Sequence, residues 1–280
     1  MTPLSTDEIA ASVRDLPALP AVVMELIQSI GDANANAELL ATKISHDQAL
    51  AAKTLRLANS SFYGLSRRVT SISEATTILG LRTLRSIATA AGLVSGFSDA
   101  ACKGFHFDAF WRHAIGTALC ARSLAQALRL DEDAAFTLGL MHDIGRLVLV
   151  SCYPQRYAAA LAYRGEVDCV VSDAERFAFD TDHASVGAMV VERWHFAPSV
   201  VAAIARHHAP QAGAEERLVD LLHVADNMAH ALDLSHLADD MVPPLSMAAW
   251  SRLALTESVC VQVFRATESQ HDAVCQALLT

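Results

Sequence analysis

The nine residues GLMHDIGRL (139–147) place an imidazole and a carboxylate side by side in an otherwise apolar run. Large aliphatic side chains flank His142 and Asp143 on both sides, which is typical of a buried helix. Burying two such polar groups without strong partners is costly. The stretch therefore predicts a partner for the pair: a metal ion, a phosphate group or another side chain.

The rest of the chain also reads as helical. Alanine and leucine are abundant, only 12 of the 280 residues are glycine, and no segment shows the sustained alternation that a sheet needs. We therefore predict an all-α protein, a multi-helix bundle. After two short N-terminal helices, the expected helices are 35–45, 47–59, 71–80, 81–97, 106–129, 131–150, 154–164, 167–178, 182–195, 198–208, 215–233, 246–253 and 256–278.

A small, polar break, SDAACKG (98–104), is the best internal boundary. It predicts a smaller N-terminal helical lobe over residues 1–100. A larger helical bundle with closing C-terminal helices follows over 101–280, and the two lobes form one continuous unit.

The formal net charge of −10 argues against bulk electrostatic binding to nucleic acid. The charge is uneven, however. Between Lys53 and Arg85, six basic residues face one acid, Glu74, a local excess of 6 − 1 = 5 positive charges. Such a region can dock an anionic partner, but solvated arginines on helix surfaces are the favoured interpretation for any single residue.

Several features predict a soluble cytoplasmic protein with no membrane partner. The N-terminus has early acids and no apolar signal-peptide core, and no run long enough to span a membrane lacks a charged residue. The six cysteines are scattered without a C-x-x-C pair, which suits a reduced protein rather than a disulfide scaffold.

Metal-ligand residue types are concentrated in the larger lobe. Five histidines and two aspartates come from five helical segments: His113, His142, Asp143, His183, His207, His208 and Asp226. Neutral imidazole and carboxylate suit a divalent metal such as iron, manganese or zinc, and helix bundles build such sites from facing helices. Two neighbouring ions need about this many ligands, with one carboxylate such as Asp143 as a bridge. No organic cofactor is predicted.

Other interpretations of these residues stay open. His183 taken alone is better explained as a hydrogen-bonded core residue, and His207 and His208 near a helix C-terminus can simply favour the helix dipole. The remaining histidines show no such arrangement, and we interpret them as surface or core residues: His46, His106, His195, His223, His230, His236 and His271.

The order His113, His142-Asp143, Asp226 resembles the signature of the HD superfamily of metal-dependent phosphohydrolases. The additional His183 and His207-His208 resemble the longer ligand set of the HD-GYP branch, which hydrolyses cyclic di-GMP. The N-terminal lobe is similar to the HDOD family of bacterial signalling domains. That similarity covers roughly residues 10–210 and is carried by LPALPAVVMELI (16–27), ISHDQALAAKTLRLANSSFYG (44–64) and TSISEATTILGLRTLRSIA (70–88).

The two resemblances imply different functions. HDOD domains are related to HD hydrolases by fold, many have lost the ligands, and they are usually output or scaffolding modules. This sequence keeps the ligands, yet it lacks the Gly-Tyr-Pro motif, has Arg146 where a lysine is usual, and has Ala109 where three-metal members have an acid. The resemblance therefore supports neither a third metal nor specificity for cyclic di-GMP.

The resemblance also implies a role for each residue. A first ion would be held by His113, His142, Asp143 and Asp226, and a second by Asp143, His183, His207 and His208. A water between them would attack a phosphorus, which makes Asp143 a catalytic candidate. Arg146 is a second catalytic candidate, because its guanidinium can donate to a phosphate oxygen. A salt bridge is an equally good explanation for this arginine.

We predict a bacterial signal-transduction module of the HDOD type that acts as an output or scaffold through contacts with a signalling protein. A mono- or dinuclear metal site and a phosphate-containing ligand are part of that prediction. The alternative is a metal-dependent phosphohydrolase, a phosphodiesterase acting on a nucleotide or cyclic dinucleotide.

Overall fold

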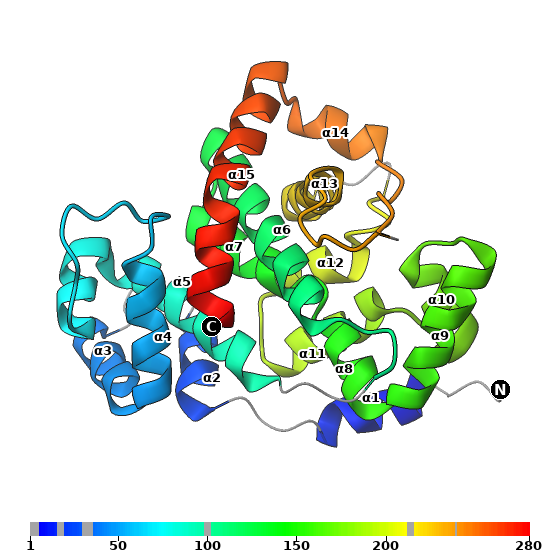
Figure 1. Ribbon diagram of the computed structural model, residues 1–280, viewed down its shortest axis with the longest axis horizontal. Coiled ribbons are helices and arrows are strands. Elements are labelled where there is room, and N and C mark those ends of the chain that lie inside the picture. Colours follow the sequence, from blue (N-terminus) through cyan, green and yellow to red (C-terminus); the bar gives the residue numbers. More distant parts are fainter. Residues whose placement is uncertain (1–5, 16–19, 30–35, 98–101, 212–215, 239) are drawn as a thin grey trace.

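The computed structural model describes residues 6–15, 20–29, 36–97, 102–211, 216–238 and 240–280, and all regular structure within these ranges is helical (Figure 1). The predicted all-α class is confirmed. The helices are α1 (Thr6–Asp15), α2 (Ala21–Gln28), α3 (Ala37–His46), α4 (Gln48–Ala58), α5 (Ile72–Gly96), α6 (Phe107–Ala127), α7 (Glu132–Met141), α8 (Ile144–Cys152), α9 (Pro154–Val167), α10 (Val171–Phe179), α11 (His183–Arg193), α12 (Pro198–Arg206), α13 (Arg217–Ala231), α14 (Met247–Leu253) and α15 (Glu257–Leu279).

Helices α2 to α5 form the smaller lobe, and their ends follow from local sequence. The Asp47 side chain accepts a hydrogen bond from the Leu50 amide and begins α4, and Ser71 accepts one from the Glu74 amide and begins α5. We expected two helices meeting at Gly80. The structure joins them as α5 across a kink at this glycine, where φ is 80° and ψ is 159°.

The larger lobe is built around α6. Helices α7, α13 and α15 pack against it, while α8, α11 and α12 pack together beside it (Figure 1). One apolar core runs through both lobes, because α5 packs against α7 and α15 packs against both α4 and α6. In this arrangement α6, the α7–α8 turn, the start of α11, the turn after α12 and α13 meet inside the larger lobe.

Helix α1 packs against α11 of the larger lobe, although our division placed residues 1–100 in the smaller one. The Ser12 hydroxyl lies 2.6 Å from the Tyr153 hydroxyl, and Arg193 donates to the Val13 carbonyl. Of the predicted boundary at 98–104, residues 98–101 lie outside the described residues.

The expected single helix over 131–150 is wrong in one respect, because the structure ends α7 at Met141 and begins α8 at Ile144. The interruption falls on the His142-Asp143 pair. Two close backbone approaches surround it: a Cβ on Gly139 would lie 2.6 Å from the Ala118 Cα of α6, and a Cβ on Gly145 would overlap the His183 carbonyl oxygen of α11. The glycines let both halves approach their neighbours, and the turn between them aims the polar pair inward.

Residues 132–152 are apolar and long enough to span a membrane by length and composition. Within the fold, 83% of the apolar window is buried, so this apolarity belongs to the core.

Several of the six basic residues between positions 53 and 85 make ion pairs or hydrogen bonds within the chain. Arg67 pairs with Glu74 at 2.9 Å, Arg82 pairs with Asp131 at 3.3 Å, and buried Arg85 donates to the carbonyl of a neighbouring helix end. Each of the three arginines therefore has an intramolecular partner, while the side chains of Arg67 and Arg82 stay 71% and 68% exposed.

Candidate metal centre

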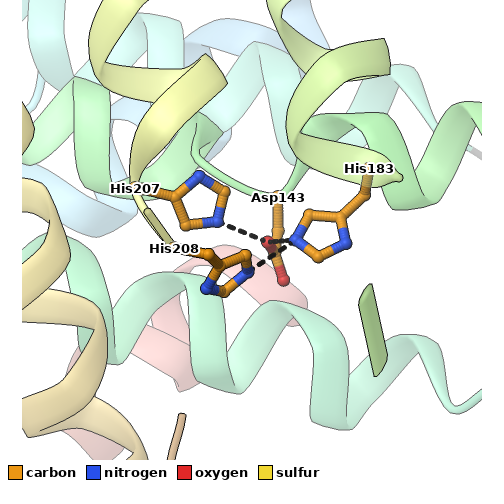
Figure 2. Close-up of side chains that lie close together, drawn as sticks. All are labelled: Asp143, His183, His207 and His208. Atoms are coloured by element: carbon orange, nitrogen blue, oxygen red, sulfur yellow. Dashed lines mark hydrogen bonds and ion pairs between the residues drawn. The ribbon is translucent and has the colours of Figure 1, made fainter. Parts of the chain in front are cut away.

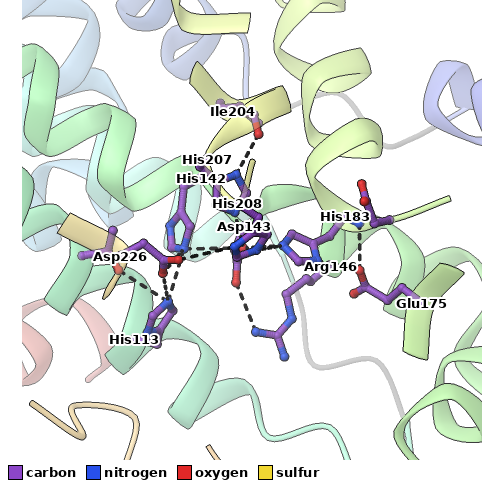
Figure 3. Close-up of polar contacts among 12 residues, drawn as sticks. His113, His142, Asp143, Arg146, Glu175, His183, Ile204, His207, His208 and Asp226 are labelled. Carbon is purple, nitrogen blue, oxygen red and sulfur yellow. Dashed lines mark hydrogen bonds and ion pairs between the residues drawn. The ribbon is translucent and has the colours of Figure 1, made fainter. Parts of the chain in front are cut away.

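The structure brings all seven predicted ligand residues together in the larger lobe (Figure 3). They come from the middle of α6, the α7–α8 turn, the first residue of α11, the turn after α12 and the middle of α13: His113, His142, Asp143, His183, His207, His208 and Asp226. Six of them are buried, and the side chain of His208 is 21% exposed.

His113, His142 and Asp226 form one group. The Nε2 atom of His113 lies 3.0 Å from Asp226 Oδ1 and 3.2 Å from His142 Nε2, and His142 Nε2 lies 3.3 Å from the same carboxylate oxygen. Ligand atoms that share one tetrahedral zinc ion at 2.0–2.1 Å are themselves about 3.3–3.4 Å apart, close to these distances. The three donor atoms therefore have the spacing of ligands around a single ion.

Asp143, His183, His207 and His208 form the second group (Figure 2). Asp143 Oδ1 lies 3.1 Å from His183 Nε2 and 3.6 Å from His207 Nε2, and His183 Nε2 lies 2.9 Å from His208 Nε2. Asp143 Oδ1 is also 3.5 Å from His142 Nε2 of the first group. This carboxylate therefore lies between the two groups, where a bridging ligand would be.

Backbone carbonyls fix the tautomers of two imidazoles. Nδ1 of His142 lies 2.7 Å from the Gly139 carbonyl, and Nδ1 of His207 lies 2.7 Å from the Ile204 carbonyl. Because a carbonyl only accepts, each Nδ1 carries a proton, and in the neutral ring the Nε2 lone pair points into the cluster. Hydrogen bonding of the remote nitrogen in this way is the usual arrangement of metal-ligating histidines.

Glu175 of α10 is a site residue that the sequence analysis missed. Its side chain is 1% exposed and accepts from His183 Nδ1 at 2.6 Å, from the His183 amide at 2.8 Å and from the Tyr157 hydroxyl at 2.8 Å. A sequence signal existed: Glu175 occupies the helical stripe of Val171 and Phe179, where an apolar residue is expected.

Arg146 makes the salt bridge that we weighed as an alternative. It donates to Asp143 Oδ2 at 3.1 Å and to the Tyr157 hydroxyl at 3.2 Å, and its guanidinium lies 5.7 Å from the centre of the Phe105 ring. These bonds close a ring of contacts, Asp143–Arg146–Tyr157–Glu175–His183–Asp143. The ring holds the bridging carboxylate and one imidazole in fixed orientations.

Burial and neighbouring charges set the ionisation of the cluster. Burial alone would raise the pKa of Asp143, but the imidazoles of His142 and His183 outweigh it and hold this pKa well below its usual range. Asp226 behaves likewise because of its imidazole neighbours. Burial lowers the pKa of His113 to about 4, so this ring is neutral at neutral pH. For His183, the carboxylates of Glu175 and Asp143 overcome burial and raise the pKa to about 10.

The donor set fits divalent metal ions. In the described part of the chain, Asp143 Oδ1, Asp226 Oδ2 and His207 Nε2 are buried and have no hydrogen-bond donor or acceptor of their own. In the neutral form, the Nε2 lone pairs of His142 and His207 face the ionised Asp143 oxygen, an arrangement that repels unless a proton or a metal ion lies between them. Two buried carboxylates and lone-pair-bearing imidazoles are the ligands that zinc, iron and manganese take.

A cavity of about 310 Å³ opens onto the cluster. His113, Asp143, His183 and His208 line it at the cluster. Its other walls carry three arginines, two phenylalanines and six residues that follow α13: Arg146, Arg164, Arg176, Phe105, Phe110, Ser235, Leu237, Asp240, Met241, Pro243 and Pro244. Its volume lies at the small end of the ligand-pocket range.

Most of the other histidines agree with their predicted surface or core placement. His46, His106, His195 and His236 are exposed, while His223 and His271 are buried and hydrogen-bonded. His230 departs from this pattern, because it lies beside His113 with ring centres 4.2 Å apart.

The fold and the cluster define the class: an HD-type helical protein with a candidate dinuclear metal centre. The chain belongs to the HDOD domain family, whose model matches residues 16–210.

Three known proteins illustrate the relationship. An uncharacterized protein of Treponema pallidum is 30% identical over 212 residues, which is 72% of this chain, and the match spans 40% of that protein's length. An HDOD domain protein of unknown function from Geobacter sulfurreducens has a TM-score of 0.83 at 21% identity, over 99% of this chain and 100% of that one. A "Putative phosphohydrolase" from Shewanella amazonensis has a TM-score of 0.70 at 26% identity, over 92% and 97% of the two chains.

Proposed function

We propose that this HDOD-type module holds two divalent metal ions and hydrolyses a phosphate ester bound in the adjoining cavity. One observation carries the proposal: seven ligand side chains converge, with lone pairs and carboxylate oxygens aimed at common points. The first ion is assigned to His113, His142, Asp143 and Asp226, and the second to Asp143, His183, His207 and His208.

The chain's own residues have distinct tasks in this proposal. Bound iron, manganese or zinc would acidify a shared water and neutralise charge on the phosphate. Asp143 spans both groups and keeps their donor atoms in register, while Arg146 holds Asp143 from the cavity wall. Arg146 also places a permanent positive charge beside the ester, which favours an anionic ligand. The small cavity favours an ester of single-nucleotide size over a cyclic dinucleotide.

The second candidate is an output module that acts only through protein contacts. It is favoured by three exposed apolar side chains in one short segment: Val242, Leu245 and Met247, exposed by 55%, 39% and 66%. Such a patch is typical of a protein interaction site. A signalling protein of the cytoplasm is the partner that we expect in either case, and we expect neither bulk nucleic acid nor a membrane to bind.

Metal analysis and a phosphoester screen test the proposal. Protein purified under reducing, chelator-free conditions should carry about two ions per chain, and Asp143→Asn should lower hydrolysis by about 100-fold or more, because it removes the bridging charge. The matched control is Asp168→Asn, an exposed aspartate with φ of 52° that asparagine also tolerates. Metal-free protein would leave the contact-only function, and hydrolysis that survives Asp143→Asn would show that the activity does not come from this centre.

A further inference from the structure

His230 extends the face of α13 that carries Asp226. The two residues are four positions apart, which places their side chains on one side of the helix. His230 Nε2 lies 3.5 Å from Asp226 Oδ1, the carboxylate oxygen that also faces His113 and His142. The His230 side chain is 13% exposed, so it reaches the first ligand group from inside the fold.

Asp240 holds the other side of this imidazole. Its Oδ1 lies 3.1 Å from His230 Nδ1, and its Oδ2 accepts from the Ser235 hydroxyl at 2.6 Å. The contact resembles the one between Glu175 and His183 in the second group, but it is an ion pair at 3.1 Å rather than an aligned hydrogen bond. In both, a carboxylate faces Nδ1 and the Nε2 atom points to the cluster, as in carboxylate–histidine–metal arrangements.

We propose that His230 is a further ligand of the ion held by His113, His142 and Asp226, and that Asp240 is its positioning residue. This inference rests on the proposed dinuclear centre. With it, each ion has three imidazoles and one carboxylate from its own group: His113, His142, His230 and Asp226 for the first, and His183, His207, His208 and Asp143 for the second. Asp240 and Ser235 also line the cavity, so the same contact ties a wall of the ligand site to the metal centre.

A separate third ion among His113, His230 and Asp240 fits less well, although their donor atoms lie within 4.8 Å of one another. His113 Nε2 already belongs to the first group, and a neutral imidazole has one lone pair. A third ion would therefore need His113 with both nitrogens deprotonated. The Nδ1 of His230 faces Asp240, which leaves its Nε2 for the ion at Asp226.

Metal stoichiometry, affinity by chelator competition, and the visible spectrum of the Co²⁺-loaded full chain test the inference. We expect His230→Ala and His230→Gln to keep one ion at wild-type affinity and to bind the other about 100-fold more weakly, with a changed Co²⁺ spectrum. Asp240→Asn should weaken the same ion by about 10-fold. The control is His46→Ala, which removes an exposed histidine at the end of α3 in the smaller lobe.

The outcomes separate this inference from the proposed function. Wild-type protein that binds no metal overturns both. Two ions in the wild type, with unchanged affinity and spectrum in both His230 variants, overturn the role of His230 and leave the dinuclear centre standing. Three ions in the wild type, one of them lost in the His230 variants, would assign His230 to a separate ion and also overturn the inference. Circular dichroism identifies variants that do not fold. If the His230 variants do not fold, the metal affinity of Asp240→Asn, a change outside the helices, decides whether the inference holds.

Discussion

At the scale of single residues, the Glu175 carboxylate orients one imidazole of the candidate centre. Glu175→Gln keeps the size of the side chain but removes the charge that faces His183 Nδ1. We expect the second ion to bind about 10–100-fold more weakly, as measured by chelator competition, with little change in the far-UV spectrum. Glu166→Gln, an exposed change on α9, is the control. Equal metal affinity in Glu175→Gln and wild type would contradict the assigned role.

Two cysteines should be inert in the folded protein. Burial raises the pKa of Cys120 and that of Cys275 to about 12. At about pH 8 only about one in 10⁴ of these thiols is a thiolate, the form that reacts. Ellman's reagent should therefore leave both residues unmodified in native protein and modify them after denaturation, as mass spectrometry of the peptides would show. Rapid labelling of either in native protein would contradict the prediction.

The residues of the candidate site divided into those that sequence could identify and those that it could not. His142 and Asp143 stood out because two polar groups interrupt an apolar run, and their order relative to His113 carried a known signature. Glu175 and Asp240 contact imidazoles rather than the proposed ions, and their positions depend on segments that meet only in the fold. Asp240 looks like an ordinary surface acid in the sequence, whereas Glu175 could have been noticed from its place on the apolar stripe of Val171 and Phe179.

At the scale of elements, the close approach of α8 to α11 depends on Gly145. A methyl group there would overlap backbone atoms of His183, which cannot move like a flexible side chain. We expect Gly145→Ala to lower the free energy of unfolding by about 1–3 kcal/mol in urea titrations. Gly165→Ala on α9, where a Cβ meets nothing within 4 Å, should instead raise it by about 0.4–1 kcal/mol. Equal stability of the two variants would refute the packing argument.

Helix ends were predictable where one side chain determines them. Asp47 and Asp182 act as N-caps, a role that sequence alone can indicate, since a cap needs only a side-chain acceptor and an amide three residues on. The break at 142–143 was not predictable, because the apolar pattern continues through it. It arises from contacts of α7 with α6 and of α8 with α11, which lie far apart in sequence.

At the scale of the whole molecule, composition and periodicity were enough for the all-α class but not for the way the lobes join. Helix α1 docks through Ser12 on Tyr153, a pair separated by 141 positions. Lys53 of α4 donates to the Leu278 carbonyl near the end of the chain at 3.3 Å. Neither contact leaves a local pattern in the sequence, so the two lobes look more separate in the sequence than they are in the fold.

The continuous core predicts one cooperative unfolding transition for the two lobes. All three tryptophans, Trp111, Trp194 and Trp250, lie in the larger lobe, so their fluorescence reports on that lobe, whereas far-UV circular dichroism reports on both. In urea, with a chelator present so that metal release does not add a step, the two curves should coincide in midpoint and slope. Because α15 packs on α4 and on α6, the unfolding of either lobe would expose apolar surface of the other lobe to water. An earlier transition seen by circular dichroism alone would mean that α2 to α5 unfold independently.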